Sequence, residues 1–281
     1  IYDSIVIGKG PAGISAAIYL KRYGFHPLIL AKDGGALERV SAIENYYGFK
    51  HITGPELLAA GVEQAEALDI PILTEEVLEI NKMENFEVLT NQNTYIAKTI
   101  VLACGASRNR YPLADKLEGV SYCATCDGFF YRKKKIAIIG NGTYMAHELS
   151  VLENMCKDIM VFTDGLPLEA KIKEEHTVVE DKINAINGTT HIEGIEAGGK
   201  VYPIEGCFIA KGNASGFTLA KHLGLGLKDN SIIVDSSFMT NIPGLFSCGD
   251  SIGGLLQISK AVGDGASCAT FVSNYLKKNN S

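Results

Sequence analysis

Residues 3–13 read DSIVIGKGPAG, and this stretch decides the fold. The apolar run Ile5–Ile7 is typical of a buried strand, and the glycine turn Gly8–Gly13 leads into a helical apolar pattern that ends at Gly24. A second strand is predicted at 27–30. This order of strand, GxGxxG turn, helix and strand predicts a dinucleotide site, because the glycines and the free N–H groups of the helix N-terminus can approach a pyrophosphate.

The same pattern returns after residue 135, with a strand at 136–139, Gly140-Asn-Gly142, a helix at 143–155 and a strand at 159–162. A later segment, NIPGLFSCGD at 241–250, is expected to form a strand that ends in Gly-Asp, and a helical run from 257 to 276 follows it. The late position of segment 241–250 in the chain predicts that this segment folds back and completes the first domain. We therefore expect an α/β protein with two nucleotide-binding domains, the second inserted in the first. The predicted boundaries are 1–113 with 234–281 for one domain and 114–233 for the other.

Composition narrows the function classes. The 281 residues are 46% hydrophobic and 21% charged, so a globular chain with a sizeable core is expected. The net charge of −6 gives no whole-protein reason to expect nucleic acid or anionic lipid as a partner. The apolar runs are far shorter than the roughly 20 residues of a membrane-spanning helix. There is no basic stretch followed by an apolar run at the start, so a cytoplasmic location is expected.

Two of the seven cysteines, Cys123 and Cys126, form a CxxC pair. Such a pair is either a redox disulfide or half of a zinc site, and a zinc site needs a second half. The other cysteines, at 104, 156, 207, 248 and 268, are isolated, and no HxxxH partner exists, so no metal is expected. In a redox pair, one thiolate attacks a partner disulfide and the other resolves the mixed disulfide. The adjacent Asp127 is suited to proton transfer.

The chain resembles the bacterial low-molecular-weight thioredoxin reductases. The matching segments are GKGPAG at 8–13, GGAL at 34–37, IENYYGF at 43–49, LACGA at 102–106, CATCDGFF at 123–130 and GLFSCGD at 244–250. This resemblance implies two Rossmann-like domains of three β/β/α layers, one for FAD and one for NADPH, in a homodimer that reduces thioredoxin. It also implies that Cys126 faces the flavin and that Cys123 attacks thioredoxin, with Asp127 as the third catalytic residue.

The resemblance further implies a set of FAD-binding positions. The pyrophosphate would lie on the glycine turn, the ribityl or phosphate side at Asp250, the isoalloxazine between Asn45 and the 257–258 backbone, and the adenine at the strand around Val77. The complete set is Gly8, Gly10, Pro11, Ala12, Gly13, Lys32, Gly35, Leu37, Asn45, Val77, Ala103, Gly105, Gly249, Asp250, Gln257 and Ile258. The acidic residue expected after the second strand is missing, since Lys32 stands there, so backbone contacts are expected to hold the ribose.

The second glycine motif departs from the pattern of the NADPH enzymes. Met145 occupies the position of a small residue, so the helix is expected to stand off from the strand. The next strand lacks the family's His-Arg-Arg cluster for the 2′-phosphate and leads to Asp164 instead. Asp164 could bind the 2′-OH of NADH, which is one interpretation.

The preferred interpretation is that this domain has lost nucleotide binding. That state resembles the ferredoxin-dependent flavin thioredoxin reductases of anaerobic bacteria, and it implies ferredoxin as electron donor. A conventional NADPH- or NADH-dependent reductase with an altered pocket is the alternative. Ferredoxins are usually acidic, and the basic run 132–135 is one candidate docking site, although such a run is more often a solvated turn.

Overall fold

The computed structural model describes residues 1–106, 111–114, 117–212, 216–228 and 231–279. The chain folds into two compact units, one made of Ile1–Ser107 with Ser215–Ser281 and the other of Arg108–Ala214. An insertion of the second unit into the first was expected from the order of the motifs. The return to the first unit occurs earlier in the chain than the boundary predicted at residue 234.

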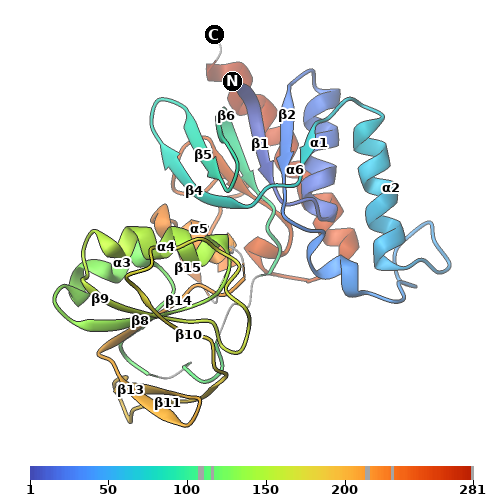
Figure 1. Cartoon of the computed structure of the whole chain (residues 1–281). Coiled ribbons are helices and arrows are strands. Elements are labelled where there is room, and N and C mark those ends of the chain that lie inside the picture. Colours follow the sequence, from blue (N-terminus) through green and yellow to red (C-terminus); the bar gives the residue numbers. More distant parts are fainter. Residues whose placement is uncertain (107–110, 115–116, 213–215, 229–230, 280–281) are drawn as a thin grey trace. The chain divides into compact units, whose positions relative to one another are not determined.

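The first unit is built on a largely parallel sheet (Figure 1). Its strands are β1 (Tyr2–Ile7), β2 (Pro27–Leu30), β3 (Ile72–Leu73), β4 (Val77–Lys82), β5 (Phe86–Thr90), β6 (Thr94–Leu102) and β17 (Leu245–Ser247). The order is β3-β2-β1-β6-β5-β4, and β17 also pairs with β6. The first half of β6 pairs antiparallel with β5, whereas its second half pairs parallel with β1 and β17. The carboxyl ends of β1, β6 and β17 are therefore neighbours, which is where a Rossmann-type fold places its ligand.

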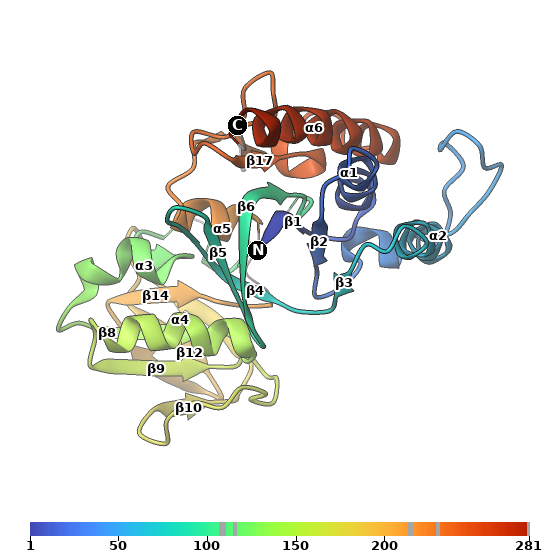
Figure 2. The same ribbon diagram turned by 90° about the horizontal axis from the view of Figure 1, so that it is seen from above.

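The helices of the first unit are α1 (Pro11–Arg22), η1 (Gly35–Arg39), α2 (Gly54–Glu66), η3 (Gly249–Ile252) and α6 (Ile258–Asn279). Pro11 begins α1, where its fixed φ suits the first helical turn, and α2 begins with a capping box between Thr53 and Glu56. The helices α1 and α6 lie side by side against the parallel strands (Figure 2). Their facing residues, such as Ala16, Ala17 and Ala269, are fully buried in one core cluster, so the C-terminal helix completes the first domain.

The segment that returns early to the first unit carries α5 (Gly216–His222), β15 (Leu227–Lys228) and β16 (Ser231–Ile232). The helix α5 packs against β4, and β16 packs against η3, both in the first unit. A side chain at Gly216 would collide with Cys104, so the backbone passes close to the end of β6. These contacts are long-range in sequence, which explains why no local change of composition marked the boundary.

The second unit has three layers (Figure 1). Its helices are α3 (Ala124–Asp127), η2 (Gly128–Tyr131) and α4 (Thr143–Glu153). The parallel strands are β7 (Val120–Ser121), β8 (Lys135–Ile139), β9 (Asp158–Phe162), β10 (Thr177–Val179) and β14 (Gly206–Ile209), in the order β10-β9-β8-β14-β7. An antiparallel sheet of β11 (Ile183–Asn187), β12 (Gly194–Ala197) and β13 (Lys200–Pro203) covers the face opposite α4. The predicted β/β/α layering is thus present in this unit.

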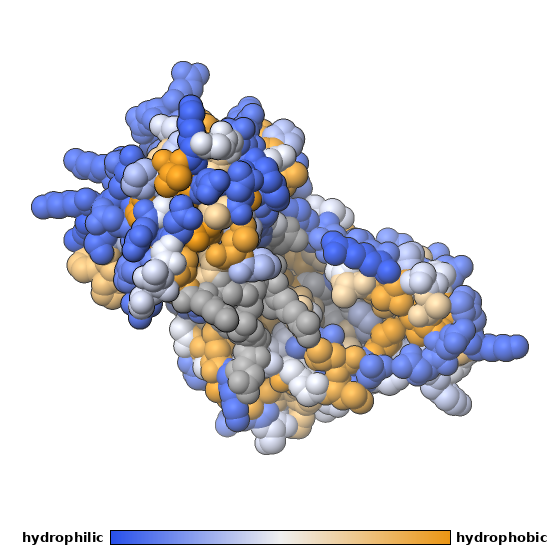
Figure 3. All heavy atoms as spheres, turned by 90° about the horizontal axis from the view of Figure 1, so that it is seen from below, coloured by the Kyte–Doolittle hydropathy of each residue, from blue (hydrophilic) through white to orange (hydrophobic). Residues whose placement is uncertain are grey.

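The core of the second unit lies between its two sheets. Ile139 and Phe162 from the parallel strands share one buried cluster with Ile183 and Ile195 from the antiparallel layer. Among the described residues, no helix is long and apolar enough to cross a membrane. On the face seen in Figure 3, hydrophobic residues form small patches between hydrophilic ones, as the charged fraction of the sequence indicates.

Candidate functional site

The CxxC pair of the second unit is oxidised, because Cys123 and Cys126 form a disulfide with an S–S distance of 1.99 Å. Cys123 precedes α3, and its sulfur accepts a hydrogen bond of 3.1 Å from the N–H of Cys126. Cys123 is fully buried, whereas Cys126 is exposed. The redox interpretation of the pair therefore agrees with its covalent state, and Cys126 is the more accessible partner in this arrangement.

Two carboxylates flank the disulfide helix. Asp127 accepts a hydrogen bond of 2.7 Å from the Ser121 hydroxyl, whose oxygen accepts one of 3.1 Å from the N–H of Cys123. On the other side, the buried Glu148 of α4 accepts a 2.8 Å hydrogen bond from the N–H of Ala124, in the first turn of α3. Sequence reasoning missed Glu148. The available signal was an acidic residue on the apolar face of the helix predicted at 143–155.

The other five cysteines do not take part in a disulfide. Cys156, Cys207, Cys248 and Cys268 are buried, and Cys104 is partly exposed. Burial raises the pKa of Cys207 well above its usual value, because the thiolate would lose its hydration. These four buried thiols are core residues rather than candidate nucleophiles.

The glycine turn of the first unit combines tight packing with open space. Gly8 has a φ of +110°, and a side chain there would collide with the carbonyl of Ala103. A side chain at Gly13 would collide with the carbonyl of Gly8, whereas none of the described atoms lies within 4 Å of a Cβ placed on Gly10. The turn therefore needs glycine for packing at two positions and leaves a free approach to its backbone at the third.

A second turn lies beside the first. Gly249 begins η3 with a φ of +73°, and a Cβ there would lie 2.6 Å from the Cβ of Ala12. The carboxylate oxygen Oδ1 of the next residue, Asp250, is buried and has no hydrogen-bond partner in the part of the chain that is described. Burial raises the pKa of Asp250, although the charge of Lys260 opposes the shift. An orphaned acceptor of this kind indicates a missing donor, such as a ligand hydroxyl.

Other predicted cofactor residues come together in pairs. The side-chain amide of Asn45 donates a 2.9 Å hydrogen bond to Gln257, although the two residues are 212 positions apart. Lys32, directly after β2, donates to the carboxylate of Glu76 at 3.3 Å, and Glu76 immediately precedes Val77. Sequence reasoning missed Glu76. Glu76 places a buried carboxylate next to Lys32, which occupies the position where an acidic residue was expected to bind the ribose.

The remaining predicted positions lie on the same loops and helix start. Gly35 opens η1 with a φ of +66°, and Leu37 of η1 is buried. Gly105 has a φ of +73° and follows the end of β6, while Ile258 begins α6 directly after Gln257. The predicted set is thus distributed over turns and strand ends of the first unit alone.

The glycine turn of the second unit corrects one expectation. The helix α4 does not stand off because of Met145: a Cβ on Gly140 would lie 2.8 Å from the Cβ of Met145, whose side chain is fully buried. Close packing is retained since Gly140 has no side chain. The segment 167–170 of the same unit contacts Asn141 of the turn, whereas no described atom lies within 4 Å of a Cβ placed on Gly142. The carbonyl of Asn141 accepts hydrogen bonds from the N–H groups of Glu169 (2.9 Å) and Ala170 (3.1 Å).

Asp164, which follows β9, forms hydrogen bonds and ion pairs with other residues of its own unit. Its Oδ2 lies 2.6 Å from Nζ of Lys211, and its Oδ1 lies 3.1 Å from Nζ of Lys182 and accepts from the N–H of Ile183 at 3.0 Å. Burial works to raise the pKa of Asp164, but these hydrogen bonds outweigh it and hold the pKa below its usual value. The carboxylate is therefore a buried structural anion rather than an open ligand for a ribose.

Comparisons with known proteins place the chain in a family. The family model for pyridine nucleotide-disulphide oxidoreductases matches residues 2–265. The chain is 30% identical to a thioredoxin reductase of Ureaplasma parvum, over 100% of this chain and 98% of that protein. An atypical thioredoxin reductase from Desulfovibrio vulgaris Hildenborough is 34% identical, with 99% of both chains covered and a TM-score of 0.89. A ferredoxin-flavin thioredoxin reductase from Clostridium acetobutylicum is 28% identical over 99% of this chain and 98% of that one, with a TM-score of 0.72.

The chain thus belongs to the pyridine nucleotide-disulphide oxidoreductases and, within them, to the thioredoxin reductases, which are FAD flavoproteins. The resemblance inferred from the motifs is confirmed. Two observations on the first unit fit FAD: the open space at Gly10 gives a pyrophosphate access to the turn, and the orphaned oxygen of Asp250 offers an acceptor to a ribityl hydroxyl.

Proposed function

We propose that this thioredoxin reductase takes its electrons from reduced ferredoxin and passes them through FAD and the Cys123–Cys126 disulfide to thioredoxin. The observation that carries the choice of donor is the buried Asp164 after β9, which is already paired with Lys182 and Lys211. The glycine turn before α4 also contacts its own unit, because the carbonyl of Asn141 is hydrogen-bonded to residues 169 and 170, and its side-chain amide donates to the carbonyl of Pro167 at 3.2 Å. These contacts leave Gly142 open, so the choice of donor rests on Asp164 and not on the turn.

The charge pattern supports the same choice. A 2′-phosphate needs paired cations, and a 2′-OH needs an accessible carboxylate. The only acidic side chain at the expected position, within the described part of the segment after β9, is the buried Asp164, and Lys182 and Lys211 already neutralise it. This arrangement of the described residues supports a donor other than NADPH or NADH. The conventional nucleotide-dependent reductase remains the alternative function, because relatives of that kind share the fold.

The energetics permit the proposed direction of electron flow. A plant-type ferredoxin at about −400 mV lies roughly 130 mV below thioredoxin at about −270 mV. For two electrons this difference is about 6 kcal/mol in favour of thioredoxin reduction. When bound, FAD supplies the conversion between the one-electron chemistry of an iron–sulfur donor and the two-electron chemistry of a disulfide.

The chain's own residues carry the second half of the reaction. Two electrons and two protons convert the Cys123–Cys126 disulfide into two thiols. A thiolate of the pair then attacks the disulfide of oxidised thioredoxin and forms a mixed disulfide; the second thiolate of the pair displaces the bound thioredoxin as a dithiol and restores the CxxC disulfide. We assign Asp127 to proton transfer, because it lies beside the pair and is linked to it through the Ser121 hydroxyl.

The remaining assignments are also proposals. They are FAD binding by the predicted residues of the first unit, the role of Cys123 as the attacking thiol, a homodimer and a cytoplasmic location. The buried position of Cys123 adds a condition to its role: its sulfur must become accessible before it can attack thioredoxin.

An anaerobic titration tests the choice of donor. The absorbance of the oxidised flavin is followed while NADPH, NADH and reduced ferredoxin are added in separate experiments. We expect only reduced ferredoxin to bleach the flavin within the time of turnover. Rapid bleaching by either nicotinamide nucleotide would overturn the choice of donor and favour the conventional reductase.

A further inference from the structure

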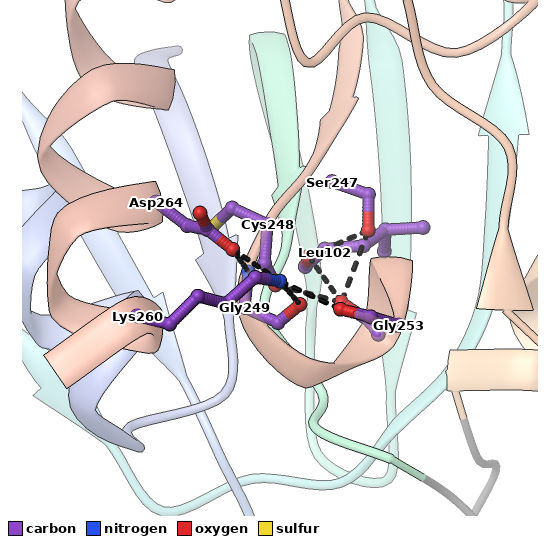
Figure 4. A network of polar contacts seen from close by, with 8 residues as sticks. Leu102, Ser247, Cys248, Gly249, Gly253, Lys260 and Asp264 are labelled. Atoms are coloured by element: carbon purple, nitrogen blue, oxygen red, sulfur yellow. Dashed lines mark hydrogen bonds and ion pairs between the residues drawn. The ribbon is translucent and has the colours of Figure 1, made fainter. Parts of the chain in front are cut away.

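A lysine in the first turn of α6 ties the Gly249-Asp250 turn to the helix. The ammonium of Lys260 donates to the carbonyl of Gly249 at 3.2 Å and to the carbonyl of Gly253 at 2.7 Å. These two carbonyls lie at the two ends of the short helix η3, which contains Asp250 (Figure 4). One side chain therefore holds both ends of the turn.

Asp264, one helical turn further along α6, completes the arrangement. Its Oδ2 lies 2.6 Å from the Lys260 ammonium and accepts a 3.2 Å hydrogen bond from the N–H of Gly249. The peptide groups of Gly249 are thus held from both sides, by the lysine at its carbonyl and by the aspartate at its N–H. Figure 4 shows these contacts converging on Gly249. Asp264 gives Lys260 a fixed direction, because the two side chains form an i,i+4 pair.

The opposite side of the turn is attached to the sheet. The hydroxyl of Ser247 donates to the carbonyl of Leu102 at 3.1 Å, and the hydroxyl of Ser251 lies within hydrogen-bonding distance of the carbonyls of Leu102 and Cys248. The turn that carries Asp250 is therefore fixed between the end of β6 and the start of α6. A carboxylate on such a turn has a defined position.

The charges around Asp250 also matter. Burial and the nearby Asp264 raise the pKa of Asp250, whereas the charge of Lys260 lowers it. The other elements packed against η3 add no charge of their own nearby: α1 has charged residues only in its last turn, at Lys21 and Arg22, and β16 is Ser231–Ile232. Among the described residues of these elements, Lys260 is accordingly the cation that balances two neighbouring carboxylates.

We propose that Lys260, oriented by Asp264, is a positioning residue for the flavin: it fixes the turn that carries Asp250 and keeps the Asp250 carboxylate ionised, as an acceptor for a hydroxyl of FAD. This inference rests on the proposed binding of FAD at Asp250. It is independent of the identity of the electron donor. The lysine acts through Asp250, so its loss weakens FAD binding without removing the binding turn.

The test measures FAD binding by the apoprotein as a function of pH. The variants are Lys260→Gln, which keeps a donor but loses the charge, and Lys260→Arg, which keeps the charge. Lys278→Gln, an exposed position in the last turn of α6, is the matched control, and Asp250→Ala tests the underlying placement. Quenching of FAD fluorescence gives the dissociation constant, and circular dichroism checks that each apoprotein is folded.

For Lys260→Gln we expect about tenfold weaker binding at neutral pH, the loss typical of one charge-assisted hydrogen bond. We also expect the pH at which binding falls to move upward by about one unit, because Asp250 then takes up a proton more readily. Lys260→Arg is expected to restore the pH profile, and Lys278→Gln to behave as the unchanged protein does. A purely structural lysine would not move the pH profile.

The outcomes distinguish a failure of the proposed role of Lys260 from a failure of the proposed FAD site at Asp250. Binding by Lys260→Gln with an unchanged dissociation constant and pH profile would overturn the inference. Equal loss in the glutamine and arginine variants, with no shift of the profile, would also overturn it, since charge would then be irrelevant. Unchanged binding by Asp250→Ala would instead show that FAD does not rest on this turn, and both the placement and the inference would fail.

Discussion

Replacing Asp164 by asparagine tests whether this carboxylate is a structural anion or a ligand for a nucleotide. The buried carboxylate receives hydrogen bonds from Lys211, Lys182 and the N–H of Ile183. Asparagine retains one acceptor oxygen but removes the charge and places an amide NH2 opposite a cation. A hydrogen bond to a charged group contributes about 1.5–3 kcal/mol, and both lysines can turn partly toward water, so we expect a loss of about 2 kcal/mol.

The assay is thermal unfolding at several pH values. A loss of about 2 kcal/mol corresponds to a decrease of about 4–8 °C in Tm for a chain of this size class. The pKa of Asp164 is lowered in the folded state, so its stabilisation is fully present above the usual value near 3.8 and is lost as pH falls through the lower, folded value. The difference between Asp164→Asn and the unchanged protein should therefore be constant from pH 7 down to about 4 and shrink below that.

Asp158→Asn is the matched control, because Asp158 is exposed at the other end of β9 and should change Tm by little. Reduction of the flavin by NADH should be equally absent in Asp164→Asn and in the unchanged protein. An unaltered Tm in Asp164→Asn would show that the carboxylate is not a structural anion. A changed KM in a measurable NADH reaction would show that Asp164 is a ribose ligand.

Three further predictions concern the glycine turn of the first unit and the disulfide of the second. Gly10→Ala should fold with a Tm close to that of the unchanged protein but retain less FAD, because a Cβ there meets no described atom but occupies the space offered to the pyrophosphate. Gly13→Ala should lose stability outright, since its Cβ would collide with a backbone carbonyl. The FAD content and the Tm of the two purified glycine variants check these predictions. Equal behaviour of Gly10→Ala and Gly13→Ala would contradict the different roles assigned to the two glycines. Asp127→Asn should slow thioredoxin reduction by about 10²- to 10⁴-fold without altering FAD content. An unchanged rate in single-turnover kinetics would remove Asp127 from proton transfer.

Local sequence patterns predicted the elements that carry the site. The second strand occurs at Pro27–Leu30 as expected, and the two glycine turns open α1 and α4 as their spacing indicated. The Gly-Asp turn at 249–250 precedes a long helix, also as predicted. These features depend on residues close in sequence, where glycine, proline and apolar periodicity determine the backbone.

Contacts between residues far apart in the sequence could not be predicted from such local patterns. The pairing of Lys32 with Glu76 joins residues 44 positions apart, and the covering of Asn141 by the segment near Ala170 depends on where a loop folds back. Met145 was expected to hold its helix away, yet Gly140 accommodates it. The contacts of Lys260 with Gly249 and Gly253 could not be read from a pattern either, since lysine at the start of a helix is more often solvated.

We expect electrons to reach thioredoxin from ferredoxin and not from a nicotinamide nucleotide. The most direct measurement is an anaerobic reconstitution in which the protein, loaded with FAD, receives oxidised thioredoxin and one donor at a time, and the thiols formed on thioredoxin are counted. We expect two thiols for every two equivalents of reduced ferredoxin, and none above background with NADPH or NADH. Sustained thiol formation with either nucleotide, and none with ferredoxin, would contradict it.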